Sequence, residues 1–125
     1  MATGDLPEQV RSFIRRHVES VLDLDILLAV RTAAGPRAAT ELARELRLNE
    51  TASAAALEKF AAIGLLERDG DCYTYKPRDR RLAADADALA DAYARRRVTV
   101  IRFIYKRPSE GVSAFADAFR LRKDR

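Results

Sequence analysis

The chain of 125 residues has little of several residue types that particular classes of protein require. It contains one cysteine and one histidine, so it can form no internal disulfide and lacks the soft ligands that a zinc site gathers. Its five glycines form no glycine-rich loop that could cradle a phosphate, and no nucleophile stands beside a base. We therefore expect no metal, no cofactor and no enzymatic activity.

Long apolar stretches are also missing. No run of apolar residues approaches the roughly 20 that a membrane span needs. The first residues show neither a basic stretch followed by an apolar core nor a small-residue cleavage pattern. The single Cys72 fits a reducing compartment, either as a half-buried structural thiol or as a redox-sensitive one. These features predict a soluble cytoplasmic protein with no membrane partner.

Hydrophobic residues make up 48% of the chain, which is enough to enclose one core. Alanine, leucine and arginine are abundant while glycine and proline are scarce, and this composition favours helices. We expect one domain, spanning residues 1–125, that is mainly α-helical.

Charge is spread unevenly along the chain although its net value is only +4. Residues 71–125 carry fourteen basic and eight acidic groups, whereas residues 38–70 carry four basic and six acidic ones. An excess of Lys and Arg suits a polyanionic partner such as DNA, because phosphate contacts release condensed counterions. A solvated charged surface is the alternative explanation.

The first third of the sequence predicts two helices. Pro7 suits a first helical position, and apolar residues follow it at spacings of three and four through Val18. Ser20 and Asp23 form a capping pair for a second helix, which is apolar on all sides and ends at Gly35-Pro36.

Two short helices meeting at a tight corner are predicted for residues 38–64. Asn49 suits the N-cap of the second helix and Gly64 its end. A two-stranded hairpin is expected at residues 65–77, because Asp69-Gly70 is a good turn signal and Pro77 ends the second strand.

The remainder of the chain predicts two further helices. One long helix is expected at about residues 79–106, although the β-branched residues 98–101 leave a strand as the alternative there. A short helix is expected at about residues 111–122, where Phe115 and Phe119 lie one turn apart. Leaving both rings in water would be costly, so they indicate docking on the same chain or on a partner.

The order of helix, turn, helix and hairpin over residues 38–77 resembles the winged helix-turn-helix of MarR-like and ArsR-like bacterial regulators. The resemblance implies a mainly α fold with a small β-hairpin, in which N- and C-terminal helices join two subunits. It also implies a DNA-binding transcriptional regulator that acts as a homodimer on a two-part operator in double-stranded DNA. The candidate dimerisation residues are Phe13, Leu89, Tyr93, Val100, Ile104, Phe115 and Phe119.

In this family the second helix of the corner enters the major groove and the wing reaches the neighbouring backbone. Residues 49–57 at the start of that helix contain no Arg, Lys or Gln, the usual readers of guanine and adenine. The alternative is therefore a winged-helix protein-interaction module that regulates a signalling or transcription protein. The candidate DNA-binding residues are Arg37, Thr40, Asn49, Thr51, Ser53, Ala54, Lys59, Lys76, Arg78 and Arg80.

Overall fold

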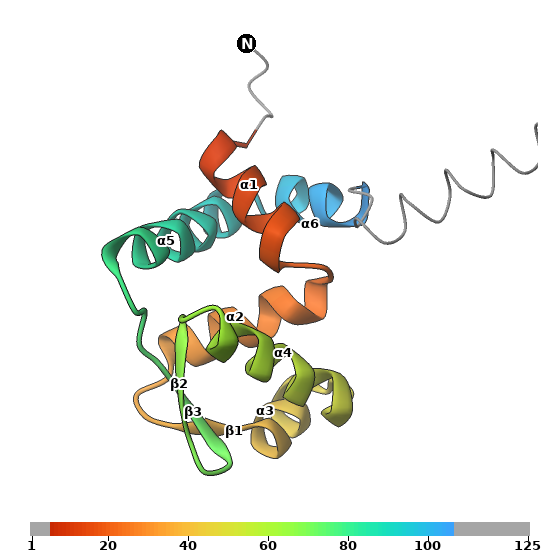
Figure 1. Ribbon diagram of the computed structural model, residues 1–125. Helices are drawn as coiled ribbons and strands as arrows, with labels where there is room; N and C mark the ends of the chain where they lie inside the picture. The colour runs from red at the N-terminus through yellow and green to blue at the C-terminus, as the bar shows by residue number, and fades with distance from the viewer. Residues whose placement is uncertain (1–5, 107–125) are drawn as a thin grey trace, which may run out of the picture.

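The computed structural model describes residues 6–106, which form six α-helices and a small antiparallel sheet of three strands (Figure 1). The predicted mainly helical class is confirmed. The helix predicted at 111–122, with Phe115 and Phe119, lies outside the described residues. The elements in chain order are α1 (Glu8–His17), α2 (Val21–Thr32), β1 (Arg37–Ala38), α3 (Ala39–Leu46), α4 (Glu50–Ala62), β2 (Leu66–Asp69), β3 (Cys72–Tyr75), α5 (Arg80–Arg95) and α6 (Arg97–Lys106).

The predicted capping pair between α1 and α2 is present. The Ser20 hydroxyl accepts a hydrogen bond from the Asp23 backbone N–H at 3.2 Å, and the Asp23 carboxylate accepts one from the Glu19 N–H at 2.9 Å. The first bond satisfies a donor that the helix itself leaves unpaired, and the second fixes the chain that connects α1 to α2. The α2 helix then runs through the centre of the molecule, with Leu24 and Leu27 fully buried.

The sheet has one strand more than the two-stranded hairpin that the sequence predicts. Its order is β1-β3-β2, and β1 pairs with β3 through Arg37 opposite Tyr73 and Ala38 opposite Cys72. A strand of two residues is too short to show an alternating pattern, so it gave no signal. The predicted turn of the β2–β3 hairpin is confirmed, with Gly70 at a φ of +65°.

The corner between α3 and α4 follows from local backbone chemistry. Arg47 takes a left-handed conformation at the end of α3, and the Leu48 N–H donates to the Ala43 carbonyl at 2.9 Å. Asn49 caps α4 as predicted, because its side-chain oxygen accepts from the Ala52 N–H at 2.8 Å. Gly64, at a φ of +98°, lies in the turn that leads from α4 into β2.

The single long helix predicted for residues 79–106 is wrong, because the helix breaks at Arg96. The backbone of Arg96 has φ −137° and ψ 58°, so the chain turns before α6 begins. Three consecutive arginines at 95–97 offer no apolar side chain to a continuous helical seam. The break lets Val100 and Ile104 of α6 return to the core beside α1 and α5.

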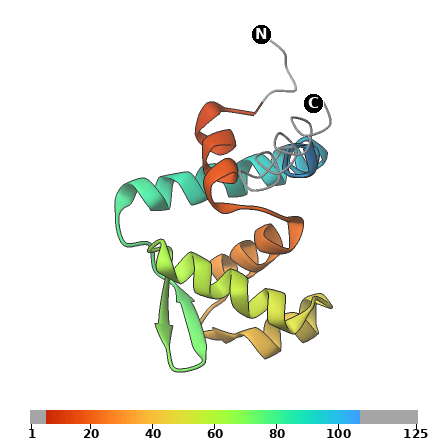
Figure 2. The same cartoon turned by 45° about the vertical axis from the view of Figure 1, so that its right-hand side comes forward.

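Two groups of elements share one apolar core. The helices α1, α5 and α6 lie together at one end, while α3, α4 and the hairpin lie at the other, with α2 between them (Figures 1 and 2). Buried side chains from all six helices and from the hairpin form one continuous cluster. Within residues 6–106, no helix is long and apolar enough to cross a membrane.

Candidate nucleic-acid interface

A shallow groove opens where α3, α4 and the hairpin meet, and we call its surroundings the α3–α4–hairpin face. The groove has a volume of about 300 Å³. Small side chains and Tyr73 make its floor, whereas polar and charged groups from all three elements stand at its edges. Its lining residues are Ala38, Ala39, Thr40, Ala54, Glu58, Arg68, Asp71 and Tyr73.

Four of the predicted DNA-binding residues lie at this face. Thr40 and Ala54 line the groove itself. Thr51 is exposed in the first turn of α4, beside the exposed Asn49. The side-chain oxygen of Asn49 is occupied by the cap of its own helix, which leaves its amide N–H groups as the free donors.

Ser53 does not belong to this face, so the prediction that it is presented to a DNA groove is wrong. The side chain is fully buried, and its hydroxyl donates to the Asn49 carbonyl at 2.8 Å. A serine can return to the carbonyl four residues earlier when a helix packs against its neighbours, as α4 packs against α2 and α3.

Lys59 points away from the face and joins α4 to α2. Its ammonium group is bonded to the Asp23 carboxylate and lies 5.3 Å from the centre of the Phe60 ring. The Lys59 side chain is 28% exposed and that of Asp23 is 11% exposed, so the ion pair is largely shielded from water. The prediction that Lys59 contacts phosphates is therefore wrong.

Arg37 is also occupied by partners from its own chain. Its guanidinium group is bonded to the carboxylates of Glu45 and Glu41, both on α3. The hydrogen bond to Glu45 raises the pKa of Arg37 and lowers the pKa of Glu45. These contacts fasten β1 to α3 and occupy the Nε and one Nη of Arg37 with carboxylates of its own chain.

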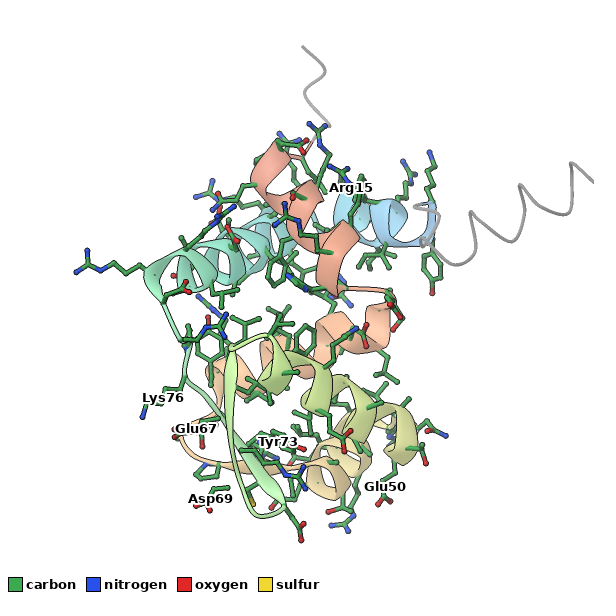
Figure 3. All side chains as sticks on the ribbon, viewed as in Figure 1. Arg15, Glu50, Glu67, Asp69, Tyr73 and Lys76 are labelled. Carbon is green, nitrogen blue, oxygen red and sulfur yellow. The ribbon has the colours of Figure 1, made fainter. Side chains whose placement is uncertain are left out.

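The three predicted cations after the hairpin are exposed and loosely held. Lys76 lies 3.6 Å from the Glu67 carboxylate (Figure 3). Arg78 lies 3.9 Å from the carboxylate of Asp79. Arg80 begins α5. Ion pairs this exposed contribute little and exchange readily for a phosphate.

Three further exposed cations, not predicted from the sequence, lie on or next to the elements that form the face. Arg44 is exposed on α3 and Arg47 is exposed directly after it, and neither forms an ion pair with another residue in the described range 6–106. Thr40 and Arg44 are four residues apart and share one side of α3, a signal that the sequence did contain, whereas Arg47 follows the helix in a left-handed conformation.

Arg68 borders the opposite side of the face, on the hairpin. Its Nε donates to the Gly70 carbonyl at 2.9 Å, and its guanidinium carbon lies 5.7 Å from the centre of the Tyr73 ring. These contacts hold the side chain along the hairpin and still leave the ends of its guanidinium group free to donate. The pairing of Arg68 with Tyr73 across the strands depends on register, so the sequence alone did not indicate it.

Carboxylates are mixed among these cations. Glu50 and Glu58 are exposed on α4, and the hairpin adds Glu67, Asp69 and Asp71 (Figure 3). The exposed side of α4 thus carries negative charge, whereas on α3 and on the hairpin single arginines stand among carboxylates. The face is electrostatically mixed, with cations at its two sides.

Most of the predicted dimerisation residues lie in the core of the single chain. Phe13, Leu89, Val100 and Ile104 are at most 4% exposed, so they are not available to a second copy. Their periodic spacing reflects contacts among α1, α5 and α6, which a sequence pattern cannot tell from contacts between subunits. Tyr93 is partly buried, with Arg97 above its ring at 5.3 Å.

Among the described residues, no three His, Cys, Asp or Glu side chains gather as metal ligands would. Cys72 is half-buried on β3 and forms no disulfide. Comparisons with protein-family models, with curated proteins and with solved structures found no match for this chain.

Proposed function

We propose that the protein is a winged helix-turn-helix transcriptional regulator that binds duplex DNA through its α3–α4–hairpin face. In this proposal α3 and α4 are the helix-turn-helix, and β2 and β3 are the wing. The observation that carries it is the placement of exposed cations on the two elements that pack against α4, with Arg44 and Arg47 on and just after α3 and Arg68 on the hairpin. This spacing suits an α-helix in a major groove with phosphate contacts on either side.

The contacts we propose are mainly to phosphates. Arg44, Arg47, Arg68 and Lys76 neutralise backbone charge, and the Thr40 hydroxyl at the start of α3 donates to a phosphate oxygen. Base reading is limited to Asn49, Thr51 and Ala54, because the exposed side of α4 has no basic residue. We therefore expect weak discrimination by direct contact and a strong dependence of affinity on salt.

If two copies of the protein bind DNA together, the operator has two half-sites, one for each copy. Because Phe13, Leu89, Val100 and Ile104 are used within one chain, a homodimer would have to use other residues. DNA itself can bring two copies onto adjacent half-sites without a large protein interface.

The test is fluorescence anisotropy with duplex DNA from the region upstream of the protein's own gene. We expect Arg44→Ala and Arg68→Ala each to reduce the slope of log K against log salt by about 0.9 for every phosphate contact removed. Arg11→Ala is the matched control, because Arg11 is a surface arginine of α1, paired with Glu8 and distant from the hairpin. Absence of salt-sensitive binding at low ionic strength would overturn the proposal.

A second candidate function has its own supporting observation. The exposed side of α4 consists of small residues with Glu50 and Glu58, a surface that suits a protein partner better than a phosphate backbone. In this alternative the winged helix is an interaction module that regulates a signalling or transcription protein.

One substitution separates the two functions. Glu58→Gln removes a negative charge from the α4 side of the groove, so it raises DNA affinity if that face meets phosphates. The same change weakens capture of a protein partner if Glu58 is a contact for it. If Glu58→Gln binds DNA as tightly as the unaltered protein but no longer captures the protein partner, the interaction module is favoured.

A further inference from the structure

A second surface of the molecule carries a concentration of positive charge that the proposed DNA interface does not use. Residues 95–106 include five Lys or Arg and no Asp or Glu. We call this surface, formed by the end of α5 and the exposed side of α6, the α5–α6 basic end. Its charged members, all exposed, are Arg95, Arg96, Arg97, Arg102 and Lys106.

The basic end also holds the two most exposed large apolar side chains of the described residues. Val98 is 60% exposed and Tyr105 is 77% exposed, and both lie on α6 with Arg102 between them. Spacings of four and three residues place Val98, Arg102 and Tyr105 on one side of the helix. An exposed aromatic ring flanked by cations is the arrangement that proteins use to stack a base while holding the backbone.

Only part of this positive charge is neutralised by the protein itself. Arg95 pairs with Asp91 at 2.9 Å, and Arg97 lies over the Tyr93 ring. Arg102 and Lys106 form no ion pair with any residue from 6 to 106. They are four residues apart, so both heads can meet one strand of phosphates.

We infer that the α5–α6 basic end is a second, sequence-independent binding surface for the phosphate backbone of nucleic acid. Charge complementarity favours this occupant. A second copy of the same face would bring two groups of like charge together, which is strongly unfavourable. A membrane would need a broad apolar face, but Val100 and Ile104 of α6 are buried in the core, and Val98 and Tyr105 alone are too little apolar area for such a face.

The position of this surface gives it a distinct use. The helix α6 lies at the end of the molecule opposite the hairpin in both views (Figures 1 and 2). A short straight duplex held at the α3–α4–hairpin face would not reach it. The basic end would therefore hold a second nucleic-acid segment, or the same DNA where it bends back.

The inference does not depend on the proposed operator contact. The probes are a labelled 20-nucleotide oligo-dT strand and a labelled 20-base-pair duplex of random sequence, titrated at 50 and 200 mM salt. We expect the double variant Arg102→Ala/Lys106→Ala to weaken binding of both probes at least fivefold at low salt and to reduce the salt slope by about 1 to 2. Tyr105→Ala should weaken binding of the oligo-dT strand by about fivefold or more and leave binding of the duplex almost unchanged.

Arg44→Ala/Arg68→Ala is the matched control, because it removes two cations from the opposite end. We expect this variant to weaken binding of promoter DNA and to leave binding of oligo-dT unchanged. All variants are first checked for native circular dichroism and an unchanged melting temperature.

Three results would overturn the inference. The first is unchanged binding of both probes by the folded Arg102→Ala/Lys106→Ala protein. The second is binding of polyglutamate but not of nucleic acid, which would assign an acidic protein partner to the basic end. The third is that the unaltered protein binds vesicles that contain phosphatidylserine but neither nucleic-acid probe, and that Arg102→Ala/Lys106→Ala no longer binds the vesicles.

Discussion

Gly64 shows how a single residue controls the position of the hairpin beside α4. Its φ of +98° is a conformation that side chains rarely adopt, and an added Cβ would lie 3.0 Å from the guanidinium group of Arg78. The Arg78 N–H also donates to the Gly64 carbonyl at 2.7 Å. The Arg78 Cβ would lie 3.1 Å from the added atom, and unlike the exposed guanidinium group it cannot rotate away.

We expect Gly64→Ala to lower the free energy of unfolding by more than about 1 kcal/mol, because the strained φ and the close contact add. Urea denaturation followed by circular dichroism measures the change. Gly35→Ala is the control, since nothing lies within 4 Å of its added Cβ and its φ is not in the positive region. Equal stability of the two variants would contradict this account of the turn.

The Tyr75 hydroxyl is buried near Arg31 and Asp87 and forms no well-aligned hydrogen bond with any of the described residues. Burial raises the pKa of Tyr75, and the nearby Asp87 adds to the rise while Arg31 opposes it. We expect Tyr75→Phe to leave stability unchanged or to increase it by up to about 1 kcal/mol, because it removes a buried, unpaired polar group. Thermal melts test this, with the exposed Tyr105→Phe as control, and a clear loss of stability would show that the hydroxyl does have a partner.

At the scale of elements, the Asp23–Lys59 ion pair joins the start of α2 to the last turns of α4. Asp23 also accepts the N–H of Glu19, so one carboxylate fixes the α1–α2 connection and α4 together. We expect Asp23→Asn and Lys59→Met each to cost about 1 to 3 kcal/mol, and their double-mutant cycle to show a coupling of about 1 kcal/mol or more.

Lys59→Met also separates a structural from a DNA-binding role. For DNA binding by Lys59→Met we expect the same slope of log K against log salt as for the unaltered protein, since Lys59 does not face the groove. If Lys59→Met has a smaller slope of log K against log salt and unchanged stability, Lys59 does contact a phosphate.

The contact between α1 and α5 predicts a dependence of stability on pH. His17 lies edge-on to Phe13, with ring centres 5.1 Å apart, and borders a hollow beside Arg16, Arg81 and Asp85. Burial lowers the pKa of His17 below its usual 6.5, and Arg16 and Lys59 act in the same direction against the opposing Asp85. The unfolded chain therefore takes up a proton at a higher pH than the folded protein does.

A lowered pKa in the folded state contributes stability that is complete above pH 6.5 and is lost as pH falls below it. We expect the free energy of unfolding to fall between pH 7.5 and pH 5.5, and His17→Gln to have a weaker dependence over the same range. Chemical denaturation at several pH values measures both proteins. Parallel curves for the two would contradict the assignment to His17.

At the scale of the whole molecule, the sequence predicted correctly those caps and turns that are formed by residues close together in the chain. The Asn49 cap, the Ser20 and Asp23 pair and the Asp69-Gly70 turn each depend on residues within four positions of one another, and each is present. The break at Arg96 was not predictable in this way, because it depends on where α6 finds space against α1 and α5. The β1 strand was missed for a similar reason, since it exists only through its partner β3.

The same distinction applies to the candidate interface. The sequence identified Thr40, Thr51 and Ala54, which do lie at the α3–α4–hairpin face. It could not show that Ser53 is buried, or that Lys59 and Arg37 are held by carboxylates from other elements. Those facts depend on the packing of α4 on α2 and of β1 on α3, and neither is visible in residue spacing.

The most direct test of the central proposal is an NMR titration of the ¹⁵N-labelled protein with duplex DNA from its own upstream region. The proposal predicts that the backbone signals of Thr40, Arg44, Thr51 and Arg68 shift together in proportion to the DNA added, and that raised salt reverses the shifts. Shifts confined to α5 and α6, or no shift at all at low ionic strength, would contradict DNA binding by the α3–α4–hairpin face.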